Sequence, residues 1–124
     1  MGDKIKLLQE IIDKSNNIVF FDGAGTSTDS GIKDFRGKNG LYKEKTKYNP
    51  EYLLSANCFY NNTSLFYDYY KSNFNVLDKK PNIIHKYLTT LESKNKLKAI
   101  ITQNIDGLHK LSGSKNVIEI HGSI

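Results

Sequence analysis

The stretch from Ile18 to Gly37, IVFFDGAGTSTDSGIKDFRG, decides the fold of this chain. It begins with an uninterrupted apolar run, residues 18–21, rich in residue types that favour β-strands and typical of a strand buried on both faces. Gly23 and Gly25 follow at once, where they permit a tight turn and a close approach of the backbone to a phosphate. A strand that ends in a glycine-rich loop predicts a βα unit of an α/β sheet.

The glycine spacing departs from the G-x-G-x-x-G pattern, because the next glycine is Gly31. A plain strand-to-helix turn is therefore the alternative interpretation of this loop. The segment Asp34-Phe35-Arg36-Gly37 favours a phosphate site, since it adds an acid, an aromatic face and the only arginine of the chain. A guanidinium group clamps a pyrophosphate better than a lysine ammonium does.

Outward from this stretch, helices and strands alternate. Apolar spacing predicts helices over residues 3–15, 50–59, 63–74 and from Pro81 to Leu91. Further strands are predicted at 97–102 and 117–120, with a short helix between them. Residues 38–49 are polar and are predicted to form a loop. Strands separated by helices predict right-handed parallel crossovers. The expected fold class is α/β, an incomplete Rossmann-like doubly wound parallel sheet of about three strands with a helical insert.

This arrangement predicts one unit over residues 1–124, with a Rossmann half in 1–33 and 97–124, and a cofactor loop and helical insert in 34–96. In the usual strand order the first strand is central, so three strands alone would leave it as an unpaired apolar edge. The sequence also stops at Ile124, directly after a strand. We therefore expect the chain to be part of a larger domain.

Two more polar clusters follow the later strands. The segment Thr102–His109, TQNIDGLH, supplies amide and carboxylate groups suited to ribose hydroxyls and a carboxamide, although a capped turn before a short helix is the alternative. His121 follows the third strand and is a candidate general base, against the alternative of a structural histidine. Ligands of open α/β sheets bind at the carboxyl ends of the strands, where all three clusters would meet.

Composition excludes several classes of protein. The 18 Lys and Arg residues against 13 Asp and Glu give a net charge of +5, but lysines spread along the chain indicate solvated faces rather than a nucleic-acid interface. No apolar run reaches the ~18–20 residues of a membrane span, and no signal-peptide core is present at the N-terminus. The single cysteine, Cys58, excludes an internal disulfide framework and a multi-cysteine zinc site in this sequence. We expect a cytoplasmic location, no nucleic-acid partner and no membrane partner.

The three motifs together, GAG to DFRG (23–37), TQNIDGLH (102–109) and HGS (121–123), resemble the sirtuin family of NAD-dependent protein-lysine deacylases, and its bacterial members most closely. The resemblance covers the whole chain but only the N-terminal half of the family's catalytic domain. It lacks the four-cysteine zinc module and the second half-sheet, which holds the adenosine.

The resemblance implies NAD as cofactor and an acetylated-lysine protein or peptide as partner, with transfer of the acetyl group to ADP-ribose and release of nicotinamide. It implies an enzyme, although this chain alone would be inactive. The residues that it assigns to cofactor binding are Gly23, Ala24, Gly25, Asp34, Phe35, Arg36, Gln103, Asn104, Ile105 and Asp106, and those assigned to catalysis are His121 and Asn104. No residue is assigned to a metal, because zinc is expected in the full-length family but its ligands are absent here.

Within that resemblance, the glycine loop and Arg36 hold the pyrophosphate, residues 104–106 line the nicotinamide pocket, and Gln103 contacts the nicotinamide ribose. Phe35 shields the reacting ribose from water. His121, as general base, activates a ribose hydroxyl.

Some positions depart from the family pattern. Asp22 stands where a small residue is usual, and its carboxylate would repel a phosphate unless it turns away or pairs. Lys33 stands where a proline is usual. Tyr67 is followed by Tyr70 rather than by the arginine of members that remove acidic acyl groups, which favours an uncharged acyl group. The alternatives left open are a sirtuin-fold NAD hydrolase or ADP-ribosyltransferase, and a non-catalytic remnant.

Overall fold

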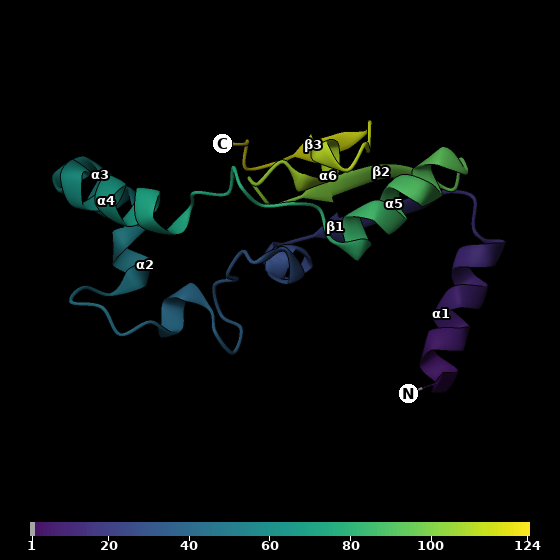
Figure 1. The fold of residues 1–124 in the computed structure, drawn as a ribbon, viewed down its shortest axis with the longest axis horizontal. Coiled ribbons are helices and arrows are strands. Elements are labelled where there is room, and N and C mark those ends of the chain that lie inside the picture. Colours follow the sequence, from purple (N-terminus) through teal and green to yellow (C-terminus); the bar gives the residue numbers. More distant parts are fainter. Residues whose placement is uncertain (1) are drawn as a thin grey trace.

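A three-stranded parallel sheet forms the centre of the computed structural model, which describes residues 2–124 (Figure 1). The strands β1 (Ile18–Asp22), β2 (Leu97–Thr102) and β3 (Val117–Glu119) lie in the order β1-β2-β3. Phe20 pairs with Ile100, which pairs in turn with Val117. The expected α/β fold with parallel strands is confirmed, and the third strand ends one residue earlier than predicted.

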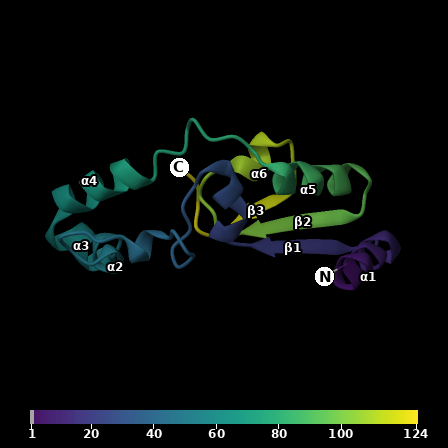
Figure 2. The same ribbon diagram turned by 60° about the horizontal axis from the view of Figure 1, so that its bottom comes forward.

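Two helices cover one face of this sheet, α5 (Ile83–Ser93) and α6 (Leu108–Leu111) (Figure 2). The core beneath α5 consists of Leu88, Leu91, Leu97 and Ile100, with partly buried apolar side chains from α1, β1 and β3 around it. Asn82 caps α5, because its Oδ1 accepts a hydrogen bond from the Ile84 N–H at 2.9 Å while its own N–H donates to His85 Nδ1. The helix therefore begins at Ile83, whereas the sequence predicted a start at Pro81, two residues earlier.

The opposite face of the sheet is exposed within residues 2–124. Val19 and Phe21 of β1 are 56% and 60% exposed, whereas Phe20 packs against the core. The prediction that the first strand is buried on both faces is therefore wrong within residues 2–124, because α5 and α6 cover only one face of the sheet. The strand does form an edge of the sheet, as expected.

Helix α1 (Gly2–Lys14) projects from the end of the sheet, and none of its residues is buried (Figure 1). It is held at its C-terminal end by Lys96, whose Nζ donates to the carbonyl oxygens of Ile12, Asp13 and Ser15 at 3.1, 2.7 and 3.1 Å. The helix starts one residue before the predicted start at Asp3, which lies in its first turn.

The helical insert lies apart from the sheet and contains α2 (Pro50–Leu53), α3 (Ala56–Asn61) and α4 (Thr63–Asn73) (Figure 1). The single helix predicted over 50–59 is two helices, because Ser55 Oγ accepts from the Cys58 N–H at 3.1 Å and starts α3 anew. Aromatic rings join α3 to α4, since the Phe59 ring packs edge-on against that of Phe66 at 5.2 Å, and Phe66 and Tyr70 stack along α4 at 5.9 Å. The predicted insert 34–96 thus includes these helices and also α5, which packs on the sheet.

Two short 3₁₀ helices complete the fold. η1 (Ala24–Ser30) follows β1 directly, and η2 (Leu41–Lys43) lies in the predicted loop 38–49. Within residues 2–124, no helix has the length and apolar character needed to cross a membrane.

Candidate functional site

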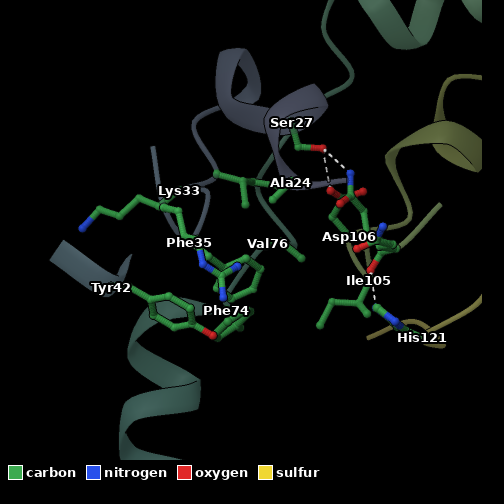
Figure 3. Close-up of a pocket in the computed structure, with 14 residues that line it drawn as sticks. Ala24, Ser27, Lys33, Phe35, Tyr42, Phe74, Val76, Ile105, Asp106 and His121 are labelled. Atoms are coloured by element: carbon green, nitrogen blue, oxygen red, sulfur yellow. Dashed lines mark hydrogen bonds between the residues drawn. The ribbon is translucent and has the colours of Figure 1, made fainter. Parts of the chain in front are cut away.

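A cavity of about 410 Å³ lies where the polar segments leave the strands (Figure 3). Residues of four segments meet in it: η1 and the loop after it as far as Tyr42, the segment that follows α4, the segment that follows β2, and His121 after β3. Eight of the predicted site residues line this cavity: Ala24, Phe35, Arg36, Gln103, Asn104, Ile105, Asp106 and His121. The structure therefore brings the three sequence motifs together.

The glycine loop leaves open space beside the cavity. A Cβ built on Gly25 has no heavy atom within 4 Å, and one built on Gly23 meets only Gln103 Oε1, at 4.0 Å. Between them Ala24 lines the cavity, so the backbone is accessible there to a flat or anionic group. This open space is what the binding of a pyrophosphate requires.

Side-chain hydrogen bonds join the glycine loop to the segment after β2 (Figure 3). Ser27 Oγ donates to Asp106 Oδ2 at 2.6 Å, and the Asn104 Nδ2 amide donates to the Gly23 carbonyl oxygen at 3.0 Å. Asp106 Oδ1 accepts from the Leu108 N–H at 2.9 Å, which fixes the start of α6. Asn104 and Asp106 are thus held in place by contacts on both sides of the cavity.

Ser27 was not predicted as a site residue, although it is fully buried and lines the cavity. Its position two residues after Gly25 is the only signal in the sequence. A small hydroxyl in a glycine loop is common in turns, so the sequence alone does not distinguish this role.

His121 is oriented by the main chain of the neighbouring strand. Its Nδ1 lies 3.1 Å from the carbonyl oxygen of Gln103, and a carbonyl can only accept a hydrogen bond. Nδ1 therefore carries the hydrogen, and Nε2 of the neutral ring keeps a free lone pair. A histidine in this tautomer can accept a proton from a ligand in the cavity.

The loop Asp34–Tyr42 presents an aromatic surface and a cation to the cavity. The Phe35 ring lies 5.3 Å from that of Tyr42, and the Arg36 guanidinium lies 5.2 Å from the Tyr42 ring centroid. Within residues 2–124, no carboxylate lies within 4.0 Å of Arg36, so its charge is available to an anionic ligand. The loop is closed by backbone hydrogen bonds from Leu41 N–H to the Asp34 carbonyl and from Tyr42 N–H to the Phe35 carbonyl.

Asp34 lies outside the cavity and lines a neighbouring hollow. Its Oδ1 accepts from the Gly37 N–H at 3.0 Å, and this contact shapes the loop that carries Arg36. A direct contact of Asp34 with the cofactor stays a prediction, as do the individual roles of the other site residues.

Five more residues complete the lining: Ile32, Lys33, Tyr42, Phe74 and Val76. Lys33 forms an ion pair with Glu44. Phe74 and Val76 come from the segment that follows α4, and no spacing or motif in the sequence indicated them. The lining is therefore partly apolar, with charges at its edges.

Asp22 does not line the cavity, because its side chain turns inward. Its Oδ2 lies 2.9 Å from His109 Nε2, and both side chains are buried. Burial by itself raises the pKa of Asp22, but the neighbouring side chains of His109, Thr102 and Thr26 outweigh burial and lower it. The carboxylate that could repel a phosphate is thus both turned away and paired.

Residues 2–124 contain no group of three or more His, Cys, Asp or Glu side chains that could hold a metal ion.

Comparison with known proteins gives a family and curated relatives. The family model described as the Sir2 family matches residues 23–124. A protein of Clostridium acetobutylicum named NAD-dependent protein deacetylase is 54% identical over 124 residues, which are 98% of this chain and 51% of that protein. A protein of Clostridium tetani with the same name is 55% identical over 98% of this chain and 50% of its own length. The chain thus spans about half the length of the curated relatives it matches.

Solved structures of Sir2 proteins also resemble this chain. One described as a structural basis for the mechanism and regulation of Sir2 enzymes aligns with a TM-score of 0.89 at 41% identity, over 99% of this chain and 48% of that one. Another, described as Sir2 bound to acetylated peptide, aligns with a TM-score of 0.80 at 38% identity, over 97% of this chain and 46% of that one.

Proposed function

The chain belongs to the Sir2 family, and from this we propose that its protein is an NAD-dependent protein-lysine deacetylase. The proposed reaction transfers an acetyl group from a lysine side chain to ADP-ribose and releases nicotinamide. The observation that carries the proposal is the meeting of Ala24, Arg36, Asn104, Asp106 and His121 around one cavity.

The cavity offers separate groups to the pyrophosphate and to the nicotinamide end of NAD. The backbone at residues 23–25 and the guanidinium of Arg36 suit the pyrophosphate. Asn104, Ile105 and Asp106 suit the nicotinamide end, because each Asp106 oxygen keeps a second lone pair beyond its contact with the protein. Bound NAD supplies the ribose that receives the acetyl group.

Two residues are proposed to act on the reacting atoms. His121 accepts the proton of a ribose hydroxyl at Nε2, since Nδ1 is occupied by the Gln103 carbonyl. Phe35, which lines the cavity with Tyr42 and Phe74, excludes water from the reacting ribose.

The acyl group is proposed to be uncharged, with acetyl as the first candidate. Phe35, Phe74, Val76 and Ile105 give the cavity an apolar side suited to a short acyl chain. An acetylated lysine in a protein or peptide is the proposed partner, supported by the relatives' printed names and by a solved relative described as bound to acetylated peptide. We further propose a cytoplasmic location, which the single cysteine supports.

The test uses the protein at its natural full length, incubated with NAD in the presence and absence of an acetylated peptide. We expect nicotinamide to be released only with the peptide, in step with the appearance of free lysine. Nicotinamide release that ignores the peptide would instead identify an NAD hydrolase. No NAD consumption in either case would identify a non-catalytic protein.

The role of His121 is tested by the variant His121→Ala. We expect deacetylation to fall by about 10²–10⁴-fold, the usual contribution of a general base, while NAD still binds. The matched control is Ile120→Ala, because Ile120 is exposed and lies next to His121 but outside the cavity. Equal losses in both variants would show that the catalytic base lies elsewhere.

A further inference from the structure

A buried pair, Asp22 and His109, lies beside the cavity without lining it. Asp22 ends β1 and His109 lies in α6, and their side chains are only 3% and 2% exposed. The 2.9 Å contact between Asp22 Oδ2 and His109 Nε2 requires a hydrogen on Nε2, because a carboxylate accepts. Breaking such a contact leaves a buried carboxylate without its partner, which is strongly unfavourable.

Asp22 holds the segment after β2 at both of its ends. Its backbone carbonyl accepts from the Gln103 N–H at 3.1 Å, and its carboxylate holds His109. Between these two attachment points lie Asn104, Ile105 and Asp106, all of which line the cavity. Besides their own hydrogen bonds to Gly23 and Ser27, these side chains are therefore placed by two contacts of Asp22, one at each end of the segment.

Within residues 2–124, no side chain other than Asp22 orients the His109 ring by a hydrogen bond. The ring of His85 packs against it at 4.8 Å from centroid to centroid, but His85 Nδ1 accepts from the Asn82 N–H instead. Burial, and then the neighbouring His109, lower the pKa of His85, so this ring is neutral. Within residues 2–124, His109 Nδ1 has no hydrogen-bond partner. Asp22 thus supplies the one directional contact of the ring.

We propose that Asp22 is a positioning residue, which acts through His109 to keep Asn104 and Asp106 at the distance from the glycine loop that NAD binding requires. This inference rests on the proposed function, because it concerns the same cavity. Asp22 does not line the cavity, so its effect is on the placement of the binding groups.

The test compares Asp22→Ala, His109→Leu and His109→Gln in the protein at its natural full length. We expect the first two variants to raise the KM for NAD about tenfold with a much smaller change in kcat, since misplaced binding groups cost up to ~10²-fold. His109→Gln should restore the KM to within about threefold of the parent value, because its side-chain amide N–H replaces the Nε2–H donor.

Thr89→Val is the matched control for a merely structural effect. Thr89 Oγ1 lies within hydrogen-bond distance of the hydroxyls of Ser112 and Ser114, at 3.2 and 2.8 Å, so the variant loosens α5 against the end of α6 without touching Asp22. We expect its melting temperature to fall while the KM for NAD stays at the parent value. A rise in KM equal to that of Asp22→Ala would overturn the positioning role.

A second readout does not depend on activity. Amide hydrogen exchange at residues 103–108 should speed up in Asp22→Ala more than exchange at residues 83–93. If the parent consumes NAD and Asp22→Ala keeps the parent KM, the inference fails while the proposed function stands. If the parent consumes no NAD, the proposed function fails, and unchanged exchange at 103–108 then overturns the inference as well. Should Asp22→Ala not fold, equal KM values in His109→Leu and His109→Gln would overturn it.

Discussion

At the scale of single residues, Asp106 combines a structural contact with a vacant acceptor site. One oxygen accepts from Ser27 and the other from the Leu108 N–H, so the carboxylate is held in place from two elements. Each oxygen retains a second lone pair that can face the cavity. Because the side chain is already oriented before a ligand arrives, little conformational entropy is lost when it accepts a further hydrogen bond.

Gly25 and Gly40 differ in how much space a side chain would find at each position. A Cβ at Gly25 meets nothing within 4 Å, whereas a Cβ at Gly40 meets the Phe35 carbonyl oxygen at 2.5 Å. We expect Gly25→Ala to keep the parent melting temperature but to weaken NAD binding about tenfold, since its methyl group enters the space offered to the pyrophosphate. Gly40→Ala should lower the stability of the loop by about 1–3 kcal/mol, as overpacking does.

Calorimetric titration with NAD measures the loss of affinity in Gly25→Ala, and thermal melting measures the loss of stability in Gly40→Ala. Parent-like NAD affinity in Gly25→Ala would show that the pyrophosphate binds away from the glycine loop.

The buried His85 makes stability depend on pH. Burial and the neighbouring His109 lower its pKa in the folded state, so the unfolded state binds more protons below the ordinary histidine pKa of about 6.5. Stability from this group is complete above about pH 6.5 and falls as the pH drops below it, by up to about 1.4 kcal/mol per pH unit. The lowered pKa of Asp22 acts only below about pH 4, near its unfolded value.

The variant His85→Asn isolates this effect, because its side-chain oxygen can still accept from the Asn82 N–H but does not titrate. Urea unfolding of the full-length protein between pH 5 and 8 should show a shallower decline of the unfolding free energy in the variant. Parallel curves for the parent and the variant would mean that His85 is protonated equally in both states.

The sequence predicted most of the motif residues that line the cavity, but it missed Ser27 within a motif and residues outside the motifs, whose places depend on distant partners. Asn104, Asp106 and His121 follow strands and carry polar groups, so their convergence was predictable. Ser27 lies far from its partner Asp106 along the chain, and Val76 reaches the cavity from a segment without any pattern. The pairing of Asp22 with His109 could not be predicted for the same reason, because the two residues meet only once α6 packs beside β1.

At the scale of elements, α1 is attached more by hydrogen bonds than by packing. Its apolar residues Ile5, Leu7, Leu8 and Ile11 are exposed, and Ile12 alone of this helix packs against the core. The three hydrogen bonds from Lys96 therefore carry much of the attachment, and its charge also interacts favourably with the C-terminal end of the helix dipole.

We expect Lys96→Met to release α1 from the sheet while leaving the cavity intact. Amide hydrogen exchange over residues 4–14 should accelerate, with a loss of about 1–2 kcal/mol from the helix-end interactions. Lys98→Met is the matched control two residues further along, in β2, since within residues 2–124 the hydrogen bonds of Lys98 Nζ go to Asn95 in the preceding turn. Equal acceleration in both variants would contradict the anchoring role of Lys96.

The predictability of each element follows from how local its signals are. Strand β2 and helix α4 were predicted closely, because apolar residues dominate 97–102 and the aromatic residues of 63–73 repeat at helical spacing. The break between α2 and α3 was missed, because Ser55 acts as a cap only through a contact with the Cys58 N–H. Over a few residues, a helix that continues and a helix that ends and restarts at a cap have the same apolar spacing. Spacing alone therefore does not locate the break.

At the scale of the whole molecule, the uncovered sheet face sets the behaviour of the 124-residue chain in solution. Val19 and Phe21 are exposed on β1, which is also an edge strand with unpaired backbone groups. The alternation of strands and helices predicted the parallel sheet, but which face would be covered depends on packing between elements far apart in sequence.

We expect this chain, expressed as residues 1–124, to self-associate or to behave as a molten globule. Light scattering and thermal melting followed by near-UV circular dichroism are the measurements. The double variant Val19→Thr/Phe21→Thr should associate less, because threonine keeps the β propensity and removes apolar surface. A sharp cooperative melt from a monomer of the parent chain would contradict the expectation.

The pairing of β1 with β2 has a consequence for folding kinetics. The two strands are hydrogen-bonded neighbours although nearly eighty residues separate them, so the closure of a long loop must precede the sheet. The α3–α4 hairpin, by contrast, needs only neighbouring residues and can form during synthesis, before β2 leaves the ribosome. The cavity therefore forms late, because the glycine loop meets its partners after β2 only once β2 has docked, and His121 joins them from the end of β3.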